Sequence, residues 1–210
     1  MADLKAMAAA VEKGDRDTTV RLVKEALAEK VGPEKILNEG LIAAMTEVGH
    51  KFTNNEIFIP EMLIAARAMA AAMQVLEPVL VKAGVKPVGK VVIGTVKQDL
   101  HDIGKNLVGM MLKGRGFQVT DLGVDVDAQK FVNATKDQGA QIVALSALLT
   151  TTMPNMRQII AALRAAGLQV KVMIGGAPVT QTFADEVGAD GYAPDAGSAV
   201  DLAMGLIGAR

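Results

Sequence analysis

The chain has 210 residues and a formal net charge of −1, so it lacks the basic excess expected of a protein that binds nucleic acid or an anionic membrane. Half of the residues are hydrophobic and 21% are charged, which is enough apolar material for a core and excludes intrinsic disorder. The absence of cysteine excludes disulfide scaffolds, thiol catalysis, Cys-ligated zinc and Cys-held iron–sulfur clusters.

The first 84 residues are predicted to be helical throughout, because their apolar residues recur with spacings of three and four. A first helix over Leu4–Val11 ends near Gly14, and Asp17 is expected to cap a second helix. Pro33 suits the first position of a third helix, and a long fourth helix covers about Pro60–Lys82. Four amphipathic helices joined by short loops favour a small antiparallel four-helix bundle.

The same region gives no signature of a targeting signal or a membrane segment. The apolar stretch before Glu12 is too short and wrongly flanked for a signal peptide. Arg67, Gln74 and Glu77 interrupt the longest apolar stretch, so no transmembrane helix is predicted. We therefore expect a soluble, cytoplasmic protein.

A change of pattern marks the expected domain boundary. Residues 83–90 contain two Gly and a Pro, so we place a helical domain at 1–84, a linker at 85–90 and a second domain at 91–210. In the second domain, short β-branched runs alternate with amphipathic segments, which predicts five βα units. The expected strands cover residues 91–96, 117–121, 142–146, 170–174 and 191–192, and the expected helices cover 103–113, 127–138, 153–166, 181–187 and 196–207.

This alternation predicts an α/β fold, in which helices cover both faces of a five-stranded parallel sheet. The expected type is Rossmann-like, with the flavodoxin-like strand order 2-1-3-4-5. In such sheets, ligands bind beyond the carboxyl ends of the strands, where the strand order reverses between strands one and three. The loops that follow strands one, three and four, beginning near Gln98, Ser146 and Gly175, are therefore the expected place of a site.

The loop after the first strand carries His101, one of two histidines in the chain, two residues after Asp99. The Asp99 carboxylate is placed to accept the ring N–H of His101, which would fix the tautomer and leave the other nitrogen free for a metal. Ser146, across the switch point, is expected to donate to Asp99. The structural alternative is that Asp99 and Ser146 cap helices and that His101 is a solvated loop residue.

An ordinary metal site is not expected in this loop. Zinc takes three or four protein ligands, and no other His or Cys lies near His101 in the sequence. A single histidine still binds a metal whose other ligands come from a macrocycle. The pair Gly175–Gly176 would let the backbone approach a large planar or nucleotide-like ligand, although a simple glycine turn explains it equally well.

Two rival motifs do not match. Gly104-Lys105-Asn106 resembles the end of a phosphate-binding loop, but Asp99 stands where that loop needs Gly, and Asn106 replaces Ser or Thr. A phosphoacceptor receiver domain would share the fold, yet Ser146 stands where its Asp would end the third strand.

The remaining motifs combine into a larger pattern. They are, in chain order, Asp99-x-His101-x-x-Gly104, Ser146-x-Leu148 and Gly175-Gly176. Together they resemble the signature of cobalamin-binding domains, such as the cobalamin-binding module of methionine synthase. The wider segments GTVKQDLHDIGKNLV, SALLTTTM and GADGYAPDA resemble the corrinoid proteins of anaerobic methyltransferase systems, and FIPEMLIAARAM resembles that family's helical cap. Gln98 departs from the pattern, because the family commonly has Gly just before the Asp.

The resemblance implies that a cobalamin or related corrinoid binds with its own base displaced, and that His101 is the lower axial ligand of cobalt. Asp99 and Ser146 would tune the imidazole as its hydrogen-bonded partners. Close backbone contact along the nucleotide tail is implied for Gly104 and for Gly175–Gly176. The other implied contacts with the corrinoid are those of Asp102, Ile103, Leu148, Thr150, Tyr192 and Ala193.

The resemblance also implies a methyl-carrier function. Cobalt(I) would accept a methyl group from a donor through a substrate-specific methyltransferase, and methylcobalt(III) would pass it to a second methyltransferase with a tetrahydrofolate or thiol acceptor. Such a carrier is not an enzyme by itself. Because no cysteine can hold an iron–sulfur cluster, a separate reductive activator would restore cobalt(I) after oxidation. Phe58, Met62 and Met69 are candidate cap residues, and residues 83–90 are the expected hinge.

Other functions remain open at this point. A cobalamin-dependent sensor or regulator would need a DNA-binding helical domain, and the lack of basic character in the first 84 residues argues against one. A mutase cobalamin subunit would work with a substrate barrel, whereas the helical cap favours methyl transfer. A signalling or scaffold module would use the loop residues only to cap helices. The sequence does not identify the methyl donor, and methanol, methylamines and methoxylated aromatics are all compatible with it.

Overall fold

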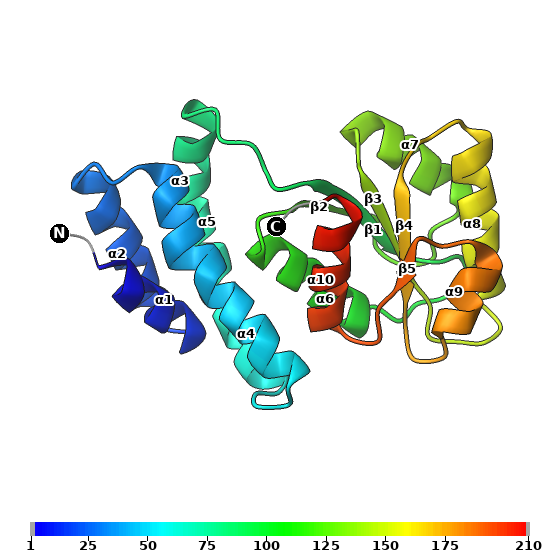
Figure 1. The fold of residues 1–210 in the computed structure, drawn as a ribbon, viewed down its shortest axis with the longest axis horizontal. Helices are drawn as coiled ribbons and strands as arrows, with labels where there is room; N and C mark the ends of the chain where they lie inside the picture. The colour runs from blue at the N-terminus through cyan, green and yellow to red at the C-terminus, as the bar shows by residue number, and fades with distance from the viewer. Residues whose placement is uncertain (1–2, 209–210) are drawn as a thin grey trace. The chain divides into compact units, whose positions relative to one another are not determined.

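The computed structural model describes residues 3–208, and the chain divides into two compact units. The helical unit comprises Met1–Pro87 with Gly114–Gly116, and the α/β unit comprises Val88–Lys113 with Phe117–Arg210. Helices α1 to α5 build the first unit, and a sheet covered by helices on both faces builds the second (Figure 1). The predicted combination of a helical region and a Rossmann-like α/β fold is therefore confirmed.

Four helical segments form the helical unit, as the sequence predicts. The third segment is a continuous run of three pieces, because a π-helix, η1, separates α3 from α4. Gly40 lies in this π-helix, and a Cβ there would be 2.6 Å from the sulfur of Met7, so glycine lets α1 approach closely. The elements are α1 (Leu4–Glu12), α2 (Arg16–Ala28), α3 (Pro33–Lys35), η1 (Ile36–Ile42), α4 (Ala43–Thr53) and α5 (Ile59–Lys82).

The residue that caps α2 differs from the prediction. Oδ1 of Asp15 accepts a hydrogen bond from the N–H of Thr18 at 3.0 Å, so Asp15 is the N-cap. Asp17 lies in the first turn, and its side chain is 95% exposed. The prediction of Asp17 is wrong because the chain turns at Gly14 with a φ of +70°, so the helix starts two residues earlier than expected.

By length and composition alone, helix α5 is long and apolar enough to cross a membrane. We did not expect this, because polar residues interrupt its apolar stretch. The core helix of a folded protein passes the same test, and α5 packs against α1, α2 and α4. Its buried residues follow the spacing of three and four that lines one face of a helix. The buried residues include Met62, Ala65, Met69, Ala72, Leu76 and Leu80. We therefore regard α5 as the central helix of this unit.

The α/β unit contains one five-stranded sheet. All strand pairs are parallel and the order is β2-β1-β3-β4-β5, which confirms the predicted order. The strands are β1 (Lys90–Thr95), β2 (Gln118–Asp121), β3 (Ile142–Ser146), β4 (Lys171–Gly175) and β5 (Gly191–Tyr192). The helices are α6 (Ile103–Gly114), α7 (Ala128–Gln138), α8 (Pro154–Ala165), α9 (Gln181–Val187) and α10 (Ala196–Leu206).

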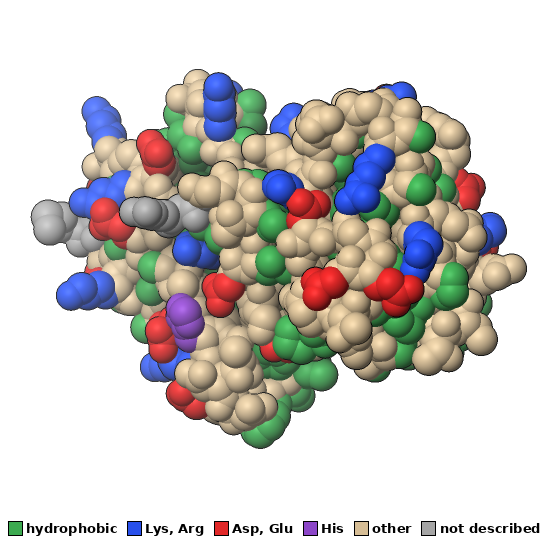
Figure 2. All heavy atoms as spheres, turned by 45° about the vertical axis from the view of Figure 1, so that its right-hand side comes forward, with side chains coloured by type: hydrophobic (Ala, Val, Ile, Leu, Met, Phe, Trp, Pro, Cys, Tyr) green, Lys and Arg blue, Asp and Glu red, His purple; other side chains and the backbone are tan. Residues whose placement is uncertain are grey.

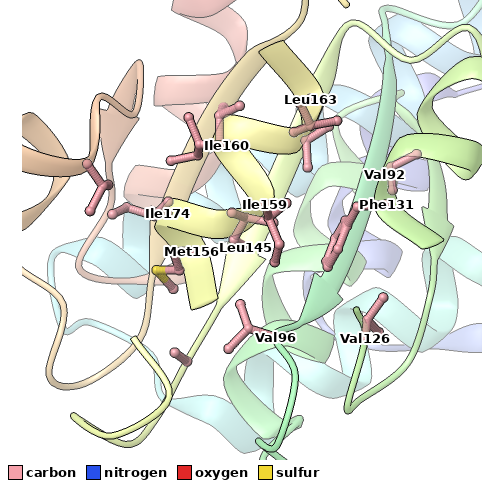
Figure 3. Packing of buried hydrophobic residues seen from close by; sticks show 14 of the residues in the cluster. Val92, Val96, Val126, Phe131, Leu145, Met156, Ile159, Ile160, Leu163 and Ile174 are labelled. Atoms are coloured by element: carbon pink, nitrogen blue, oxygen red, sulfur yellow. The ribbon is translucent and has the colours of Figure 1, made fainter. Parts of the chain in front are cut away.

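The sheet is buried on both faces, as expected for parallel strands that read as continuous apolar runs. In the register of the strands, Val92 pairs with Val143 and Val143 with Val172, so their side chains line up on one face. This face packs against Phe131 of α7 and Ile159 of α8 (Figure 3). Helices α6 and α10 cover the other face (Figure 1). The core therefore holds the carboxyl ends of the strands in fixed positions.

Charged side chains of both signs are spread over the surface. In the view of Figure 2, lysine and arginine side chains are interspersed with aspartate and glutamate. Several of them form ion pairs within four residues of each other on one helix, such as Arg21 with Glu25 at 2.7 Å. The distribution agrees with the near-neutral composition of the chain.

Candidate functional site

The strand order reverses between β1 and β3, which are hydrogen-bonded neighbours in the middle of the sheet. The chain leaves β1 toward α6 and leaves β3 toward α8, and these two helices lie on opposite faces of the sheet (Figure 1). In open α/β sheets, ligands bind beyond the carboxyl ends of the strands at such a switch point, where the loops after β1 and β3 begin. This is the place where the sequence predicts the site.

Asp99 is the centre of the hydrogen-bond network in these loops, and its side chain is fully buried. Oδ1 accepts from the backbone N–H of His101 at 3.1 Å and lies 2.7 Å from Nδ1 of the same residue. Oδ2 accepts from the N–H of Leu148 at 2.8 Å and from the hydroxyl of Thr152 at 2.7 Å. The carboxylate thus joins the loop after β1 to the loop after β3. Neither Asp99 nor His101 is occupied in capping a helix.

These contacts determine the protonation of the pair. Burial by itself would raise the pKa of the Asp99 carboxyl, but hydrogen bonds from Thr152, Leu148 and His101 outweigh it and hold the pKa well below its ordinary value. Asp99 is therefore ionised at neutral pH and can only accept hydrogen bonds. The proton between the two side chains belongs to Nδ1 of His101, and Nε2 keeps a free lone pair. The His101 side chain is 49% exposed, so a ligand can reach it.

The hydroxyl that contacts Asp99 is that of Thr152, not that of Ser146 as the sequence led us to expect. Ser146 is the last residue of β3, and its carbonyl accepts the N–H of Val96. A turn closed by the N–H of Thr152 and the carbonyl of Leu149 brings Thr152 back to the carboxylate. The Thr152 hydroxyl also lies 2.9 Å from that carbonyl, but its single proton favours the charged acceptor. The only sequence signal for Thr152 was its place in the segment SALLTTTM.

The glycine pair after β4 is required by close backbone approach. A Cβ at Gly176 would lie 1.9 Å from the carbonyl oxygen of Ala147, and the φ of Gly176 is +125°. A Cβ at Gly175 would lie 3.0 Å from the carbonyl oxygen of Ala193. At Gly104, by contrast, a Cβ would meet nothing within 4 Å. The backbone segments are therefore closely packed at Gly176, whereas the start of α6 at Gly104 is open.

Large apolar side chains are exposed near His101 and on the loop after β3. Leu100 is 71% exposed and Ile103 is 73% exposed, and both lie within two residues of His101 in the chain. Leu148 and Leu149 are also exposed on the loop that binds Asp99. Exposed apolar groups clustered on two converging loops are typical of a ligand-binding surface. Leu100 and Leu149 were not among the predicted site residues.

The other predicted residues occupy more varied positions. Asp102 is exposed and accepts a hydrogen bond from the side chain of Asn106 at 3.0 Å. Thr150 is exposed in the turn after β3. Tyr192 packs against the core on the α7–α9 face of the sheet, and Ala193 is buried. The contacts of these residues with a ligand stay predictions.

The donor set fits a corrinoid better than a free metal ion. Within residues 3–208, no group of three or more His, Asp or Glu side chains is placed to hold a metal ion. His101 offers one imidazole nitrogen, which is what a metal held in a macrocycle needs from a protein. The exposed leucines and Ile103 supply an apolar surface for such a ring, and the start of α6 at Gly104 is open.

Comparison with known families covers both units. A B12 binding domain family matches residues 89–201, and a second family, also described as a B12 binding domain, matches residues 3–77. The chain belongs to the B12-binding corrinoid proteins. The helical unit is therefore part of the family pattern and not an unrelated addition.

The most similar proteins share nearly the whole length of this B12-binding chain. Trimethylamine corrinoid protein 1 of Methanosarcina acetivorans is 44% identical over 202 residues, which are 94% of each chain. Dimethylamine corrinoid protein 1 of the same organism is 42% identical over 207 residues, which are 97% of each chain.

Solved structures extend the similarity to the fold. The crystal structure of a cobalamin-binding protein from Desulfitobacterium hafniense DCB-2 is 34% identical and has a TM-score of 0.80, over 98% of this chain and 99% of that one. One chain in the crystal structure of the methanol:cobalamin methyltransferase complex MtaBC from Methanosarcina barkeri is 28% identical to this chain. The TM-score is 0.86, over 97% of this chain and 79% of that one.

Proposed function

We propose that this corrinoid protein is a methyl carrier that holds its corrinoid through His101 and exchanges methyl groups with partner methyltransferases. The observation that carries the proposal is the buried Asp99 carboxylate bonded to Nδ1 of His101 at the switch point of a B12-binding fold. The relatives named as corrinoid proteins, and the structure of a related chain in a methyltransferase complex, support the carrier function.

The residues of the site act through the imidazole. Asp99 keeps the proton on Nδ1, so that Nε2 is the free nitrogen that would bind cobalt. Leu148 and Thr152 hold the carboxylate in place through Oδ2. Ser146 stays a candidate partner once the ligand is bound, and Gly104 and Gly175–Gly176 would line the nucleotide tail.

When bound, the corrinoid supplies a cobalt centre that takes up and gives away a methyl group. The chain contributes a group that can change its protonation in step with this cycle. That group is the Asp99–His101 pair, in which the ionised carboxylate keeps the proton on Nδ1 and would leave Nε2 to hold the cobalt.

Three partners complete the proposal. A substrate-specific methyltransferase would load the carrier, and a second methyltransferase would unload it onto a folate or thiol. A reductive activator would supply an electron after oxidation, because this chain has no cysteine with which to hold an iron–sulfur cluster. We expect these encounters to occur in the cytoplasm, since the apolar stripe of α5 is used in the helical core.

Methylated amines are the first donors to test. The two relatives described above carry trimethylamine and dimethylamine in their names. Donor choice would reside in the loading enzyme, so the test is methyl transfer to the loaded carrier by methyltransferases for each amine and for methanol.

The domain division also belongs to the proposal. We propose that residues 1–84 act as a cap for the corrinoid, that 91–210 form the binding domain, and that the linker 85–90 lies within a hinge at 83–90. Phe58 is 63% exposed, so it remains a candidate contact of the cap. Met62 and Met69 are buried in the core of the helical unit and are better explained as packing residues.

The test is the ligand of cobalt in protein loaded anaerobically with cobalamin. The protein is labelled with ¹⁵N-histidine, and electron paramagnetic resonance is recorded in the Co(II) state. Coupling to one ¹⁵N nucleus identifies a histidine ligand and distinguishes it from the unlabelled base of the cofactor. His101→Ala should abolish this coupling. His50→Ala is the matched control, because His50 is the other histidine, exposed on α4, and its replacement should leave the spectrum unchanged. Coupling that persists in His101→Ala contradicts the assignment.

A further inference from the structure

The backbone is strained in the turn that connects β1 to Asp99. The N–H of Asp99 donates to the carbonyl of Val96 at 3.2 Å, which closes a four-residue turn. Gln98 is the third residue of this turn and has a φ of +65°. A positive φ at this position favours glycine, because the side chain of any larger residue is crowded by its own backbone. Gln98 must therefore be held in place by contacts from outside the turn.

Asp125 contacts the backbone of the turn at two places, Gln98 and Asp99. Oδ1 of Asp125, in the loop between β2 and α7, accepts the N–H of Gln98 at 2.8 Å. The N–H of Asp125 donates to the carbonyl of Asp99 at 3.0 Å. Asp125 itself has a φ of +53°, a conformation that Asp tolerates better than most residues. The two loops are thus joined by two hydrogen bonds, one at the N–H of Gln98 and one at the carbonyl of Asp99.

The surrounding contacts keep Asp125 opposite the turn. Val96 and Val126 form a parallel β-bridge next to these hydrogen bonds and lie on neighbouring segments in Figure 3. The Lys97 ammonium lies 3.1 Å from Oδ1 of Asp125. Hydrogen bonds from Gln98 and Lys97 hold the pKa of the Asp125 carboxyl below its ordinary value, so the acceptor is charged at neutral pH. The carbonyl of Lys97 is bound separately by the side chain of Asn155 at 2.7 Å.

We propose that Asp125 is a positioning residue for the corrinoid ligand: it clamps the Gln98 turn and thereby sets the position of Asp99 and His101. The proposal rests on the proposed function of His101, and it adds a residue that lies outside the three sequence motifs. Glycine at position 98 would adopt the turn without help. The chain therefore depends on Asp125 because it has glutamine there.

The test is a cycle of variants at positions 98 and 125, each loaded with cobalamin. Asp125→Ala should lower cobalamin affinity by about tenfold, as removal of hydrogen-bonded partners around a metal ligand does, and should lower the fraction of cobalt that shows histidine coupling. Gln98→Gly alone should leave both quantities near those of the original protein. The double variant should recover most of the loss, because glycine no longer needs the clamp.

Two controls separate the clamp from its charge and from general stability. Asp125→Asn keeps an acceptor oxygen for the N–H of Gln98 and loses only the ion pair with Lys97, so it should behave like the original protein. Asp137→Ala removes an exposed aspartate from α7 and should change nothing. Thermal unfolding of each apo-protein shows whether a variant is folded.

A readout without cofactor makes the result independent of cobalamin binding. In the ¹⁵N spectrum of the apo-protein, the His101 imidazole should show a protonated Nδ1, and Asp125→Ala should shift it toward a mixture of tautomers. If the original protein does not bind cobalamin, the proposed function fails while this spectrum still tests the clamp. Asp125→Ala with unchanged affinity, histidine coupling and tautomer overturns the inference. Equal losses in Asp125→Ala and the double variant overturn the part assigned to Gln98.

Discussion

The helical unit and the α/β unit both have apolar cores, but they differ in how they hold buried polar groups. Within residues 3–208, the buried polar residue of the helical unit is Thr19, whose hydroxyl donates to the carbonyl of Asp15 four residues earlier. The α/β unit has one such local bond too, from the Thr135 hydroxyl to the carbonyl of Phe131, but its buried Asp99 is bound by Leu148 and Thr152, which lie 49 and 53 residues later in the chain. A bond within one helical turn survives small shifts of the fold, whereas the Asp99 bonds need two loops to keep their distance. The site residues are thus placed where the sheet fixes that distance.

The largest change in stability should come from replacing glycine by alanine where an added Cβ would lie closest to another atom. These positions are Gly176 in the α/β unit and Gly40 in the helical unit. At Gly176 the new carbon would meet the backbone of Ala147 at 1.9 Å, and the backbone conformation is itself unfavourable for alanine. At Gly40 it would meet the sulfur of Met7, the end of a flexible side chain, at 2.6 Å. We expect Gly176→Ala to lower the free energy of unfolding by about 3 kcal/mol or more, and Gly40→Ala by about 1 kcal/mol.

Chemical denaturation of the two apo-proteins measures this difference. Gly176→Ala should also lose cobalamin binding, whereas Gly40→Ala should retain it. Equal losses of stability in the two variants would show that the α/β loops are as adaptable as the helical core, and the contrast between the units would then be wrong.

The next effect concerns pH. The pKa of Asp99 is held below its ordinary value of 3.8, so its bonds stabilise the fold at pH values above that, and this contribution is lost as the pH falls toward the folded-state pKa. Asp99→Asn offers one acceptor oxygen to several donors and should cost about 1–3 kcal/mol at neutral pH. The variant should also lose less stability than the original protein as the pH falls below about 5.

Asp15 of the helical unit provides the control for this measurement. Hydrogen bonds from Thr18 also lower the pKa of Asp15, but this carboxyl caps α2 on the surface. Asparagine caps helices as well as aspartate does, so Asp15→Asn should leave the neutral-pH stability nearly unchanged. Urea denaturation between pH 3 and pH 7 compares the three proteins. An acid response of Asp99→Asn identical to that of the original chain would remove Asp99 as its source.

Much of the fold could be predicted because its signals are local. The alternation of β-branched runs and amphipathic segments predicted all five βα units within one or two residues, and β1 covers Lys90–Thr95 where residues 91–96 were expected. The order of the strands followed from the few arrangements that such units adopt. The π-helix at Ile36–Ile42 could not be predicted, because one extra residue in a helical turn leaves the apolar spacing almost unchanged.

The site shows where sequence reasoning stops. Asp99 and His101 are two residues apart, so their contact could be predicted from the loop alone. The sequence pattern favoured Ser146 over Thr152, because the turn between Leu149 and Thr152 that brings the Thr152 hydroxyl to Asp99 has no clear signal in the sequence. The cap of α2 poses the same problem, since Asp15 and Asp17 are both good capping residues and only the start of the helix decides between them.

A smaller effect should distinguish the buried hydroxyl of Thr152 from that of Thr19. Thr152→Val and Thr19→Val each remove one buried hydrogen bond and keep the shape of the side chain. Each should lower the stability by about 1 kcal/mol. Thr152→Val should in addition weaken cobalamin binding by about tenfold, because it removes a partner of Asp99. Thr152→Ser should restore the binding, and Ser146→Ala should leave apo-protein stability nearly unchanged. If Ser146→Ala weakens the apo-protein and Thr152→Val does not, the hydroxyl has been assigned to the wrong residue.

The smallest change in stability, with a clear change in binding, is expected at Gly104. A Cβ at Gly104 or at Gly109 would meet nothing within 4 Å, and neither residue has a positive φ. Both lie in α6, where alanine is the better helix former, so each alanine variant should change stability by less than about 1 kcal/mol. If the ligand occupies the open space at Gly104, an added methyl group would collide with it. Gly104→Ala should therefore weaken cobalamin binding several-fold, and Gly109→Ala should not. Titration of the two variants, followed by corrin absorbance, compares them directly. Equal affinities would mean that the ligand does not reach the start of α6, and the contact proposed for Gly104 would have to be given up while the histidine ligand could still stand.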